Sequence, residues 1–349
     1  MDPEEMKFLA LLVHRGHLER GDAEKILPRL QEGDQLDALL EEVVGWEPDF
    51  VDKMRRTRGG EIPEIPGYEV LGSLGSGGTA DVFRVREKRT ARPLALKVLR
   101  PDAARNAATR KAFIAEARML ETLDHPGLVK GYGVARSGTV YFNRLELVEG
   151  KTLLELLDEG RRFEEAVALR ILLEAAEVLK YLGEEHVVHR DVKPGNIMLT
   201  ANARVKLIDL GFAAGQDEVT NPNDSAVGTV AYLSPEQARG GAAADIRSDI
   251  YSLGVTLFQL LFGRLPFEGD DDEVLRKQVM ERLSSPELKS LGVSPHTHYF
   301  IEKMMAKEVE VRYQDWDELI GDIRSQLEGR ESLDWSKGST RRPTPRRGR

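Results

Sequence analysis

After Gly67 the hydrophobic pattern changes from a strand period to a helical period, and that change constrains the fold more than any other feature. After Gly67, the stretches "YEVLGSLGSGG", "ADVFRVREK" and "PLALKVLR" read as strands joined by glycine-containing or polar turns. From Glu164 onward, apolar residues recur mainly at helical spacing. Strands followed by helices predict an α+β fold with two lobes, a small mostly-β lobe and a large mostly-α lobe.

The residues before Gly67 also show helical spacing. Residues 1–60 contain short amphipathic segments broken by glycines, which predict a small all-helical module rich in acidic residues. The segment "RGGEIPEIPG" combines adjacent glycines with two prolines, so we expect a linker at residues 61–67. The module is expected to bind a partner, to pack on the lobes or to dimerise, and we favour a protein-interaction module.

Composition narrows the class of protein. The chain has 349 residues, 41% of them hydrophobic and 31% charged, as in soluble globular proteins. A net charge of −9 argues against nucleic acid as the partner, and the absence of cysteine excludes disulfides and thiol nucleophiles. The apolar runs are shorter than the roughly 20 residues that cross a bilayer, and the acidic start is unlike a signal peptide. We therefore expect a cytoplasmic protein without a transmembrane segment.

The stretch "LGSGGTADV" at residues 74–82 predicts a glycine-rich turn between two strands, with Gly75 and Gly77 at its tip. Backbone without side chains can approach phosphate oxygens closely and donate N–H groups to them. Taken alone, such a stretch is better explained by an ordinary hairpin turn. The residues that follow decide between these interpretations.

Lys97 lies in the otherwise apolar strand "PLALKVLR". A buried ammonium group without a partner is costly, so Lys97 requires an anion. Glu116 lies in the strongly periodic helix "RKAFIAEARMLETL" and is the expected partner, although a solvated helix face would explain it as well. Together, the turn, the lysine and the glutamate indicate a phosphate-binding site.

These residues resemble the protein kinase family, and in particular the bacterial serine/threonine kinases, with Ala80 at the family's third glycine. The resemblance covers about residues 66–328. It implies a kinase domain at 68–328, with an N-lobe at 68–145, a hinge at 146–148 and a C-lobe at 149–328. It also implies an ATP site with Leu145 as gatekeeper. The residues implied for that site are Leu74, Gly75, Ser76, Gly77, Gly78, Thr79, Ala80, Asp81, Val82, Ala95, Lys97, Leu145, Glu146, Val148 and Met198.

The segment "HRDVKPGNIM" has the spacing of the kinase catalytic loop. The resemblance implies that Asp191 accepts or orients the proton of the attacking hydroxyl and that Lys193 neutralises charge on the transferred phosphoryl group. It assigns Asn196 and Asp209 to magnesium, with manganese as an alternative, and Lys97 with Glu116 completes the catalytic set. His189 is expected to be a packed structural residue, and Leu210 replaces the family's phenylalanine after Asp209.

Downstream motifs resemble those of protein kinases rather than small-molecule phosphotransferases. Ser234-Pro235-Glu236 stands for the family's Ala-Pro-Glu, and the resemblance pairs Glu236 with Arg312. Asp249 is expected to accept hydrogen bonds from the catalytic-loop backbone. Lys193 and Thr229 are typical of kinases that act on serine and threonine.

Arg190 beside Asp191 predicts control by phosphorylation of the activation loop, because a phosphate there would find this guanidinium. The candidate acceptors are Thr220 and Ser225. One departure argues against strong dependence on phosphorylation, since alanines at 213 and 214 replace the basic residue that often follows this motif.

The sequence therefore predicts a serine/threonine protein kinase that transfers the γ-phosphate of ATP to protein substrates and phosphorylates its own activation loop. The alternative is a pseudokinase or ATP-binding scaffold, which Ala80 and Leu210 favour slightly. Residues 329–349 form a basic tail, expected to be disordered. The tail is interpreted as a solvated terminus, a contact for an acidic partner, or a phosphoacceptor at Thr340 or Thr344.

Overall fold

The computed structural model describes residues 3–14, 17–57, 65–210, 230–240, 244–281, 283 and 292–329. The chain divides into two compact units. The amino-terminal unit contains residues 1–123 and 130–147, and the carboxy-terminal unit contains residues 124–129 and 148–349. Each unit is described by itself.

The amino-terminal unit begins with the predicted helical module. Gly33 and Gly45 adopt φ angles of 108° and 74° and end helical segments, which explains why glycines interrupt the pattern. The module has its own hydrophobic core, in which Leu12, Ile26 and Leu40 are fully buried. Its elements are α1 (Pro3–His14), α2 (Arg20–Glu32), α3 (Leu36–Leu39), the π-helical segment Leu40–Val44 and α4 (Pro48–Thr57).

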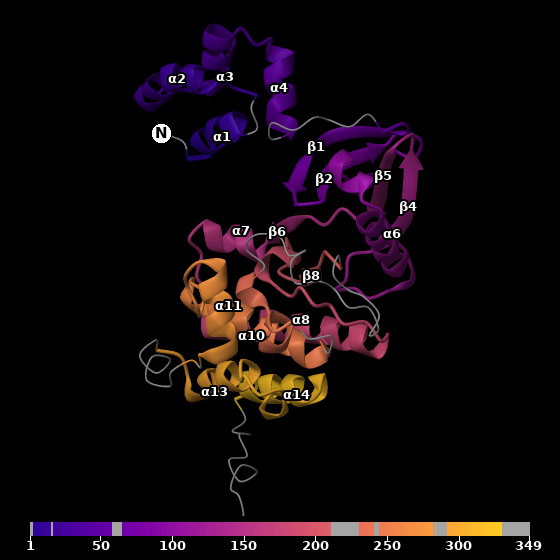
Figure 1. The fold of residues 1–349 in the computed structure, drawn as a ribbon, viewed down its shortest axis with the longest axis vertical. Coiled ribbons are helices and arrows are strands. Elements are labelled where there is room, and N and C mark those ends of the chain that lie inside the picture. Colours follow the sequence, from indigo (N-terminus) through magenta and orange to yellow (C-terminus); the bar gives the residue numbers. More distant parts are fainter. Residues whose placement is uncertain are drawn as a thin grey trace, which may run out of the picture. The chain divides into compact units, whose positions relative to one another are not determined.

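A five-stranded antiparallel sheet with the order β1-β2-β3-β5-β4 forms the rest of this unit together with two helices (Figure 1). Side chains alternate between its faces, and Phe83, Val85 and Leu96 are buried in a core on one of them. Helix α6 packs against β4 and β5. The elements are β1 (Tyr68–Ser76), β2 (Ala80–Glu87), β3 (Pro93–Leu99), α5 (Pro101–Arg105), α6 (Ala107–Thr122), β4 (Gly131–Ser137) and β5 (Val140–Leu145).

The end of the predicted linker belongs to this sheet. Ile65 is buried in the same core as Phe83, and its carbonyl accepts a hydrogen bond from the backbone N–H of Tyr68 at 3.0 Å. Gly67 has a φ of 88°, and its carbonyl accepts from the N–H of Lys88. Residues 65–67 are therefore fixed to the sheet, and residues 58–64 lie outside the described part of the chain.

The carboxy-terminal unit is mostly helical, as predicted. Helix α8 packs against α10 and α14, and a small antiparallel sheet of order β6-β7-β8 accompanies them (Figure 1). No helix in the described ranges combines the length and apolarity needed to span a membrane. The elements are β6 (Gly150–Thr152), α7 (Leu153–Asp158), α8 (Glu165–Glu184), the 3-10 turn Pro194–Asn196, β7 (Ile197–Thr200), β8 (Val205–Leu207), the 3-10 turn Val230–Tyr232, α9 (Pro235–Ala238), α10 (Ile246–Phe262), α11 (Asp271–Met280), α13 (Pro295–Met304), the 3-10 turn Val309–Val311 and α14 (Trp316–Leu327).

Candidate functional site

In the amino-terminal unit, Lys97 and Glu116 form the ion pair expected from the sequence. The Nζ atom of Lys97 on β3 lies 2.8 Å from Oε1 of Glu116 on α6. The side chains are 13% and 6% exposed, so both charges are largely removed from water. A buried pair of this kind fixes an ammonium group in place. It therefore orients a cation that can bind phosphate oxygens.

The glycine-rich turn is shorter than we predicted. Gly75 lies within β1, where it pairs with Val82, because the ladder continues to the partners Ser76 and Asp81. The prediction that Gly75 lies at the tip is therefore wrong, and residues 77–79 form the turn. The turn closes through a 2.8 Å hydrogen bond from the N–H of Gly77 to the carbonyl of residue 80.

One face of the sheet collects residues predicted to contact adenine. Ala95 is the cross-strand partner of Leu145, and Val82 is the partner of Lys97. Cross-strand partners point to the same face of a sheet, so these four side chains share one face. Asn143, which we did not predict, lies opposite Lys97 on this face and is 1% exposed. Its Oδ1 is buried without a hydrogen-bond partner among the described residues.

Gly131 allows β4 to approach the helix that carries Glu116. A Cβ atom at Gly131 would lie 2.7 Å from the Cβ of Leu120 and 2.8 Å from its carbonyl carbon. Because backbone cannot yield easily, we expect Gly131→Ala to lower the free energy of unfolding by about 1–3 kcal/mol. Urea unfolding measures this change. Gly75→Ala is the matched control, because no atom lies within 4 Å of the added Cβ. Equal losses in the two variants would contradict the close approach.

In the carboxy-terminal unit, the Asp191 carboxylate is held from one side. Its Oδ2 accepts a 2.9 Å hydrogen bond from Nδ2 of Asn196 and lies 2.8 Å from Nζ of Lys193. Its Oδ1 is buried and has no hydrogen-bond partner in the described part of the chain. An orphaned carboxylate oxygen is an acceptor for a hydroxyl proton, since buried polar atoms are normally paired. The residues predicted for the catalytic loop are thus brought together.

A backbone hydrogen bond brings the segment that carries Asp209 to Asn196. The N–H of Ile208, the residue before Asp209, donates to the carbonyl of Asn196 at 3.1 Å. The Nδ2 of Asn196 makes both of its bonds to Asp191, which leaves Oδ1 as the atom suited to a cation. An amide oxygen and a carboxylate fit magnesium, which proteins commonly bind through few side chains together with substrate phosphates.

Asp249 supports the catalytic loop as expected. Its carboxylate oxygens accept hydrogen bonds from the backbone N–H groups of His189 at 2.8 Å and Arg190 at 2.7 Å. Burial raises the pKa of Asp249, and these two hydrogen bonds act in the opposite direction. Arg190 has a φ of 65°, which is unusual for a residue with a side chain, and the two bonds help to hold this conformation. His189 is 1% exposed, in agreement with a packed role.

Glu236 forms the predicted ion pair with Arg312, through distances of 2.7 and 2.8 Å. Two further contacts were not predicted. Ser248 Oγ donates to Oε1 of Glu236 at 2.6 Å, and Nε2 of Gln237 donates to the carbonyl of Arg190 at 3.1 Å. The second contact ties the start of α9 to the catalytic loop. The Ser-x-x-Gln spacing from residue 234 indicates a capping box at this helix but not its long-range contact.

Other predicted residues belong to the hinge, to β7 or to segments outside the described residues. The N–H of Glu146, in the predicted hinge, donates to the carbonyl of Lys130 at 2.9 Å, so this N–H is not available to a ligand. Met198 lies half-buried in β7. Thr220, Ser225 and the other predicted activation-loop residues at 213, 214 and 229 lie outside the described residues, as do Thr340 and Thr344.

Known proteins support an assignment to a family. A family model described as "Protein kinase domain" matches residues 68–320. A probable serine/threonine-protein kinase of Streptomyces coelicolor is 37% identical over 270 residues, which cover 75% of this chain and 40% of that protein. PrkC of Bacillus subtilis is 34% identical over 260 residues, covering 74% and 40%, and PknB of Mycobacterium leprae is 36% identical over 263 residues, covering 73% and 42%.

The chain thus spans about two fifths of the length of the curated relatives that it matches. The matched region includes Lys97, Glu116 and the catalytic loop, which are the residues that the geometry of each unit singles out. The chain therefore belongs to the protein kinase family, and its relatives over this region are bacterial serine/threonine-protein kinases.

Proposed function

We propose that this chain is an ATP-dependent serine/threonine protein kinase whose kinase domain comprises residues 68–328. The observation that carries the proposal is the buried Oδ1 of Asp191, which has no hydrogen-bond partner among the described residues, while Lys193 and Asn196 hold Oδ2. A scaffold that only binds nucleotide has no need of such a carboxylate. Family membership and the names of the relatives support the same activity.

Two groups of residues would hold the cofactors. Asn196 and Asp209 offer an amide oxygen and a carboxylate to a divalent ion, for which the family supports magnesium. Lys97, fixed by Glu116, offers an ammonium group to phosphate oxygens of ATP. When bound, the ion supplies positive charge beside the phosphate oxygens. The remaining ATP contacts are proposed from the resemblance alone.

The chemical roles follow from position and charge. The Oδ1 of Asp191 accepts a hydrogen bond from the hydroxyl of the substrate and orients it for attack. Lys193 contributes its ammonium group beside this carboxylate, with its side chain 22% exposed. Phosphoryl transfer depends mainly on positioning and electrostatic stabilisation, so a rigidly held carboxylate is sufficient for this role.

Incubation of the full chain with ATP, magnesium and casein tests the activity. We expect phosphoserine and phosphothreonine in the acid hydrolysate of casein and no phosphotyrosine, because Lys193 and the relatives' names indicate serine and threonine acceptors. Phosphotyrosine as the main product would contradict the proposed specificity. Nucleotide binding without phosphate transfer to any protein would favour the scaffold.

We also propose that the kinase phosphorylates its own activation loop at Thr220 or Ser225. Support comes from Arg190, a buried guanidinium next to Asp191 that suits a phosphate group. After incubation with ATP and magnesium, the intact mass is expected to rise by about 80 Da per phosphate, and Thr220→Ala with Ser225→Ala is expected to remove that increase. An active preparation whose mass stays unchanged would rule out autophosphorylation.

The helical module is proposed to bind another protein. Its separate hydrophobic core supports an independent folding unit, and internal ion pairs link its helices, such as Arg55 with Glu5 at 2.7 Å and with Asp37 at 2.5 Å. Residues 330–349 of the predicted basic tail lie outside the described residues.

A further inference from the structure

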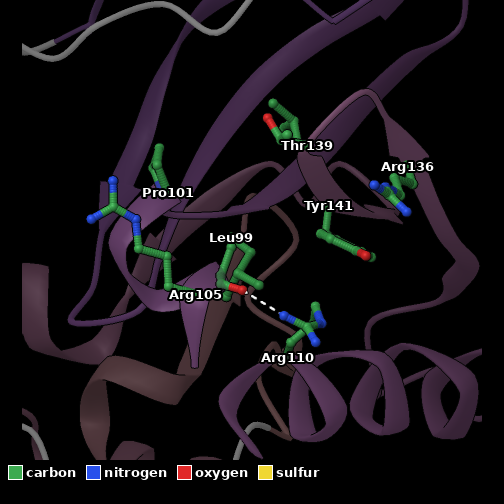
Figure 2. Close-up of a pocket in the computed structure, with 9 residues that line it drawn as sticks. Leu99, Pro101, Arg105, Arg110, Arg136, Thr139 and Tyr141 are labelled. Carbon is green, nitrogen blue, oxygen red and sulfur yellow. Dashed lines mark hydrogen bonds between the residues drawn. The ribbon is translucent and has the colours of Figure 1, made fainter. Parts of the chain in front are cut away.

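A cavity of about 400 Å³ lies in the amino-terminal unit, among the end of β3, α5, the start of α6 and the β4–β5 hairpin (Figure 2). This volume is within the range of ligand pockets, about 300–1,000 Å³. None of its lining residues belongs to the predicted ATP site. The residues that line it are Leu99, Pro101, Ala104, Arg105, Arg110, Arg136, Thr139, Val140 and Tyr141.

The cavity is positively charged, although the chain carries a net charge of −9. Three arginines from three different elements line it: Arg105 from α5, Arg110 from α6 and Arg136 from β4. Among the described residues that line the cavity, none is acidic. Arginine is suited to bidentate recognition of carboxylate and phosphate groups. The cavity is therefore suited to an anionic ligand.

Two of the arginines are held by backbone carbonyls. Arg110 donates from Nη1 to Ala104 at 2.8 Å, and Arg136 donates from Nε to Gly138 at 2.6 Å. The guanidinium of Arg136 also lies 5.2 Å from the ring centroid of Tyr141. Each group uses one of its five N–H donors in these bonds, so donors remain for a ligand. A guanidinium that is already oriented loses little conformational entropy on binding.

The ligand must carry more than one negative group. Figure 2 shows Arg105, Arg110 and Arg136 on separate sides of the cavity, so a ligand that contacts all three presents negative groups in more than one direction. The space between them is bounded by apolar side chains, including the buried Leu99 and the half-buried Val140. A ligand that matches these features has an apolar group in the middle and carboxylates on either side.

We propose that this cavity binds an acidic peptide segment in which an apolar side chain enters beside Leu99 and flanking carboxylates contact the three arginines. The peptide backbone sets the spacing between the carboxylates, which a compact anion such as pyrophosphate does not provide. This binding goes beyond the proposed kinase activity and does not require it.

Direct binding to the full chain, without ATP, tests the proposal. The probe is a fluorescein-labelled Glu-Glu-Phe-Glu-Glu peptide, which contains no phosphoacceptor, and the readout is fluorescence anisotropy. We expect Arg105→Gln combined with Arg136→Gln to weaken binding about tenfold or more, because each removes charge-assisted hydrogen bonds. Thr139→Trp, at the exposed rim, is expected to weaken binding by occupying the cavity without changing charge.

The control is Arg89→Gln, which removes one positive charge at an exposed position outside the cavity and should leave the affinity within about twofold. Replacing phenylalanine in the probe by alanine should weaken binding about tenfold. The proposal is wrong if a Lys-Lys-Phe-Lys-Lys probe binds equally well or if Arg89→Gln weakens binding as much as the cavity variants. It is also wrong if pyrophosphate displaces the probe and the phenylalanine makes no difference, or if no binding occurs at millimolar peptide.

Discussion

Replacing Asp191 with asparagine is expected to lower the turnover of the proposed phosphotransfer by about 10²-fold or more, the scale of a general-base contribution. The substitution preserves the local shape. The amide oxygen at position 191 can still accept from Asn196 and Lys193, which hold Oδ2 in the native protein. The substitution replaces Oδ1 by an amide NH2 group, which donates hydrogen bonds and cannot accept one. In the native protein Oδ1 is a buried acceptor without a partner among the described residues.

Initial rates at saturating ATP and casein measure the change in turnover, and calorimetric titration with ATP and magnesium measures nucleotide binding. We expect binding to change little, because Asp191 is assigned to the substrate hydroxyl. Asp272→Asn, at the exposed start of α11, removes a carboxylate from the same unit and is expected to keep full activity. If the Asp191 variant retained native turnover, its assigned role would be wrong and the carboxylate would be structural.

Sequence motifs and their resemblance to those of the family predicted two ion pairs of the protein. The Lys97–Glu116 pair and the Glu236–Arg312 pair both form, since an ion pair between buried charges leaves few alternatives. Gly75 was misplaced because glycine is compatible with both a turn and a strand, and pairing with Val82 decides the outcome. The local sequence pattern does not show which residues of two strands pair with each other.

Contacts between distant segments that no motif marks could not be predicted from the sequence. Gln237 reaches the carbonyl of Arg190 across 47 residues, and Gly131 meets Leu120 because β4 and α6 pack closely. The arginine-lined cavity has the same origin, since its three arginines come from separate elements and each alone resembles an ordinary surface residue. These features depend on tertiary packing rather than on period or motif.

Arg312→Met is expected to destabilise the carboxy-terminal unit by about 3–5 kcal/mol, because it leaves the Glu236 carboxylate without its cation. The Arg312 side chain is 0% exposed. All five of its N–H donors have partners, namely both carboxylate oxygens of Glu236 and three backbone carbonyls. Its guanidinium also lies 5.0 Å from the ring centroid of Tyr251. Because the site is buried, water cannot take over the hydrogen bonds that Arg312 makes with these partners.

Urea unfolding followed by circular dichroism at neutral pH measures the loss. Arg324→Met is the matched control, since its pair with Glu177 is exposed and is expected to contribute less than about 1 kcal/mol. Replacing Glu236 by leucine as well as Arg312 by methionine should recover much of the loss, because an apolar pair removes the unpaired charge. A single variant as stable as the Arg324 control would contradict the energetic role of the pair.

The same pair predicts a pH dependence with a definite sign. Burial alone would raise the pKa of Glu236, but hydrogen bonding and charge attraction from Arg312 outweigh it and lower this pKa from 4.5 to about 2. Because the folded-state pKa lies below the unfolded value, the contribution is fully present above about pH 4.5 and is lost as the pH falls towards about 2. The difference in unfolding free energy between the native protein and Arg312→Met should therefore be constant near neutral pH and should shrink between about pH 4.5 and 2. A difference that stayed constant down to pH 2 would show that the stabilisation comes from packing of the Arg312 side chain and not from its charge.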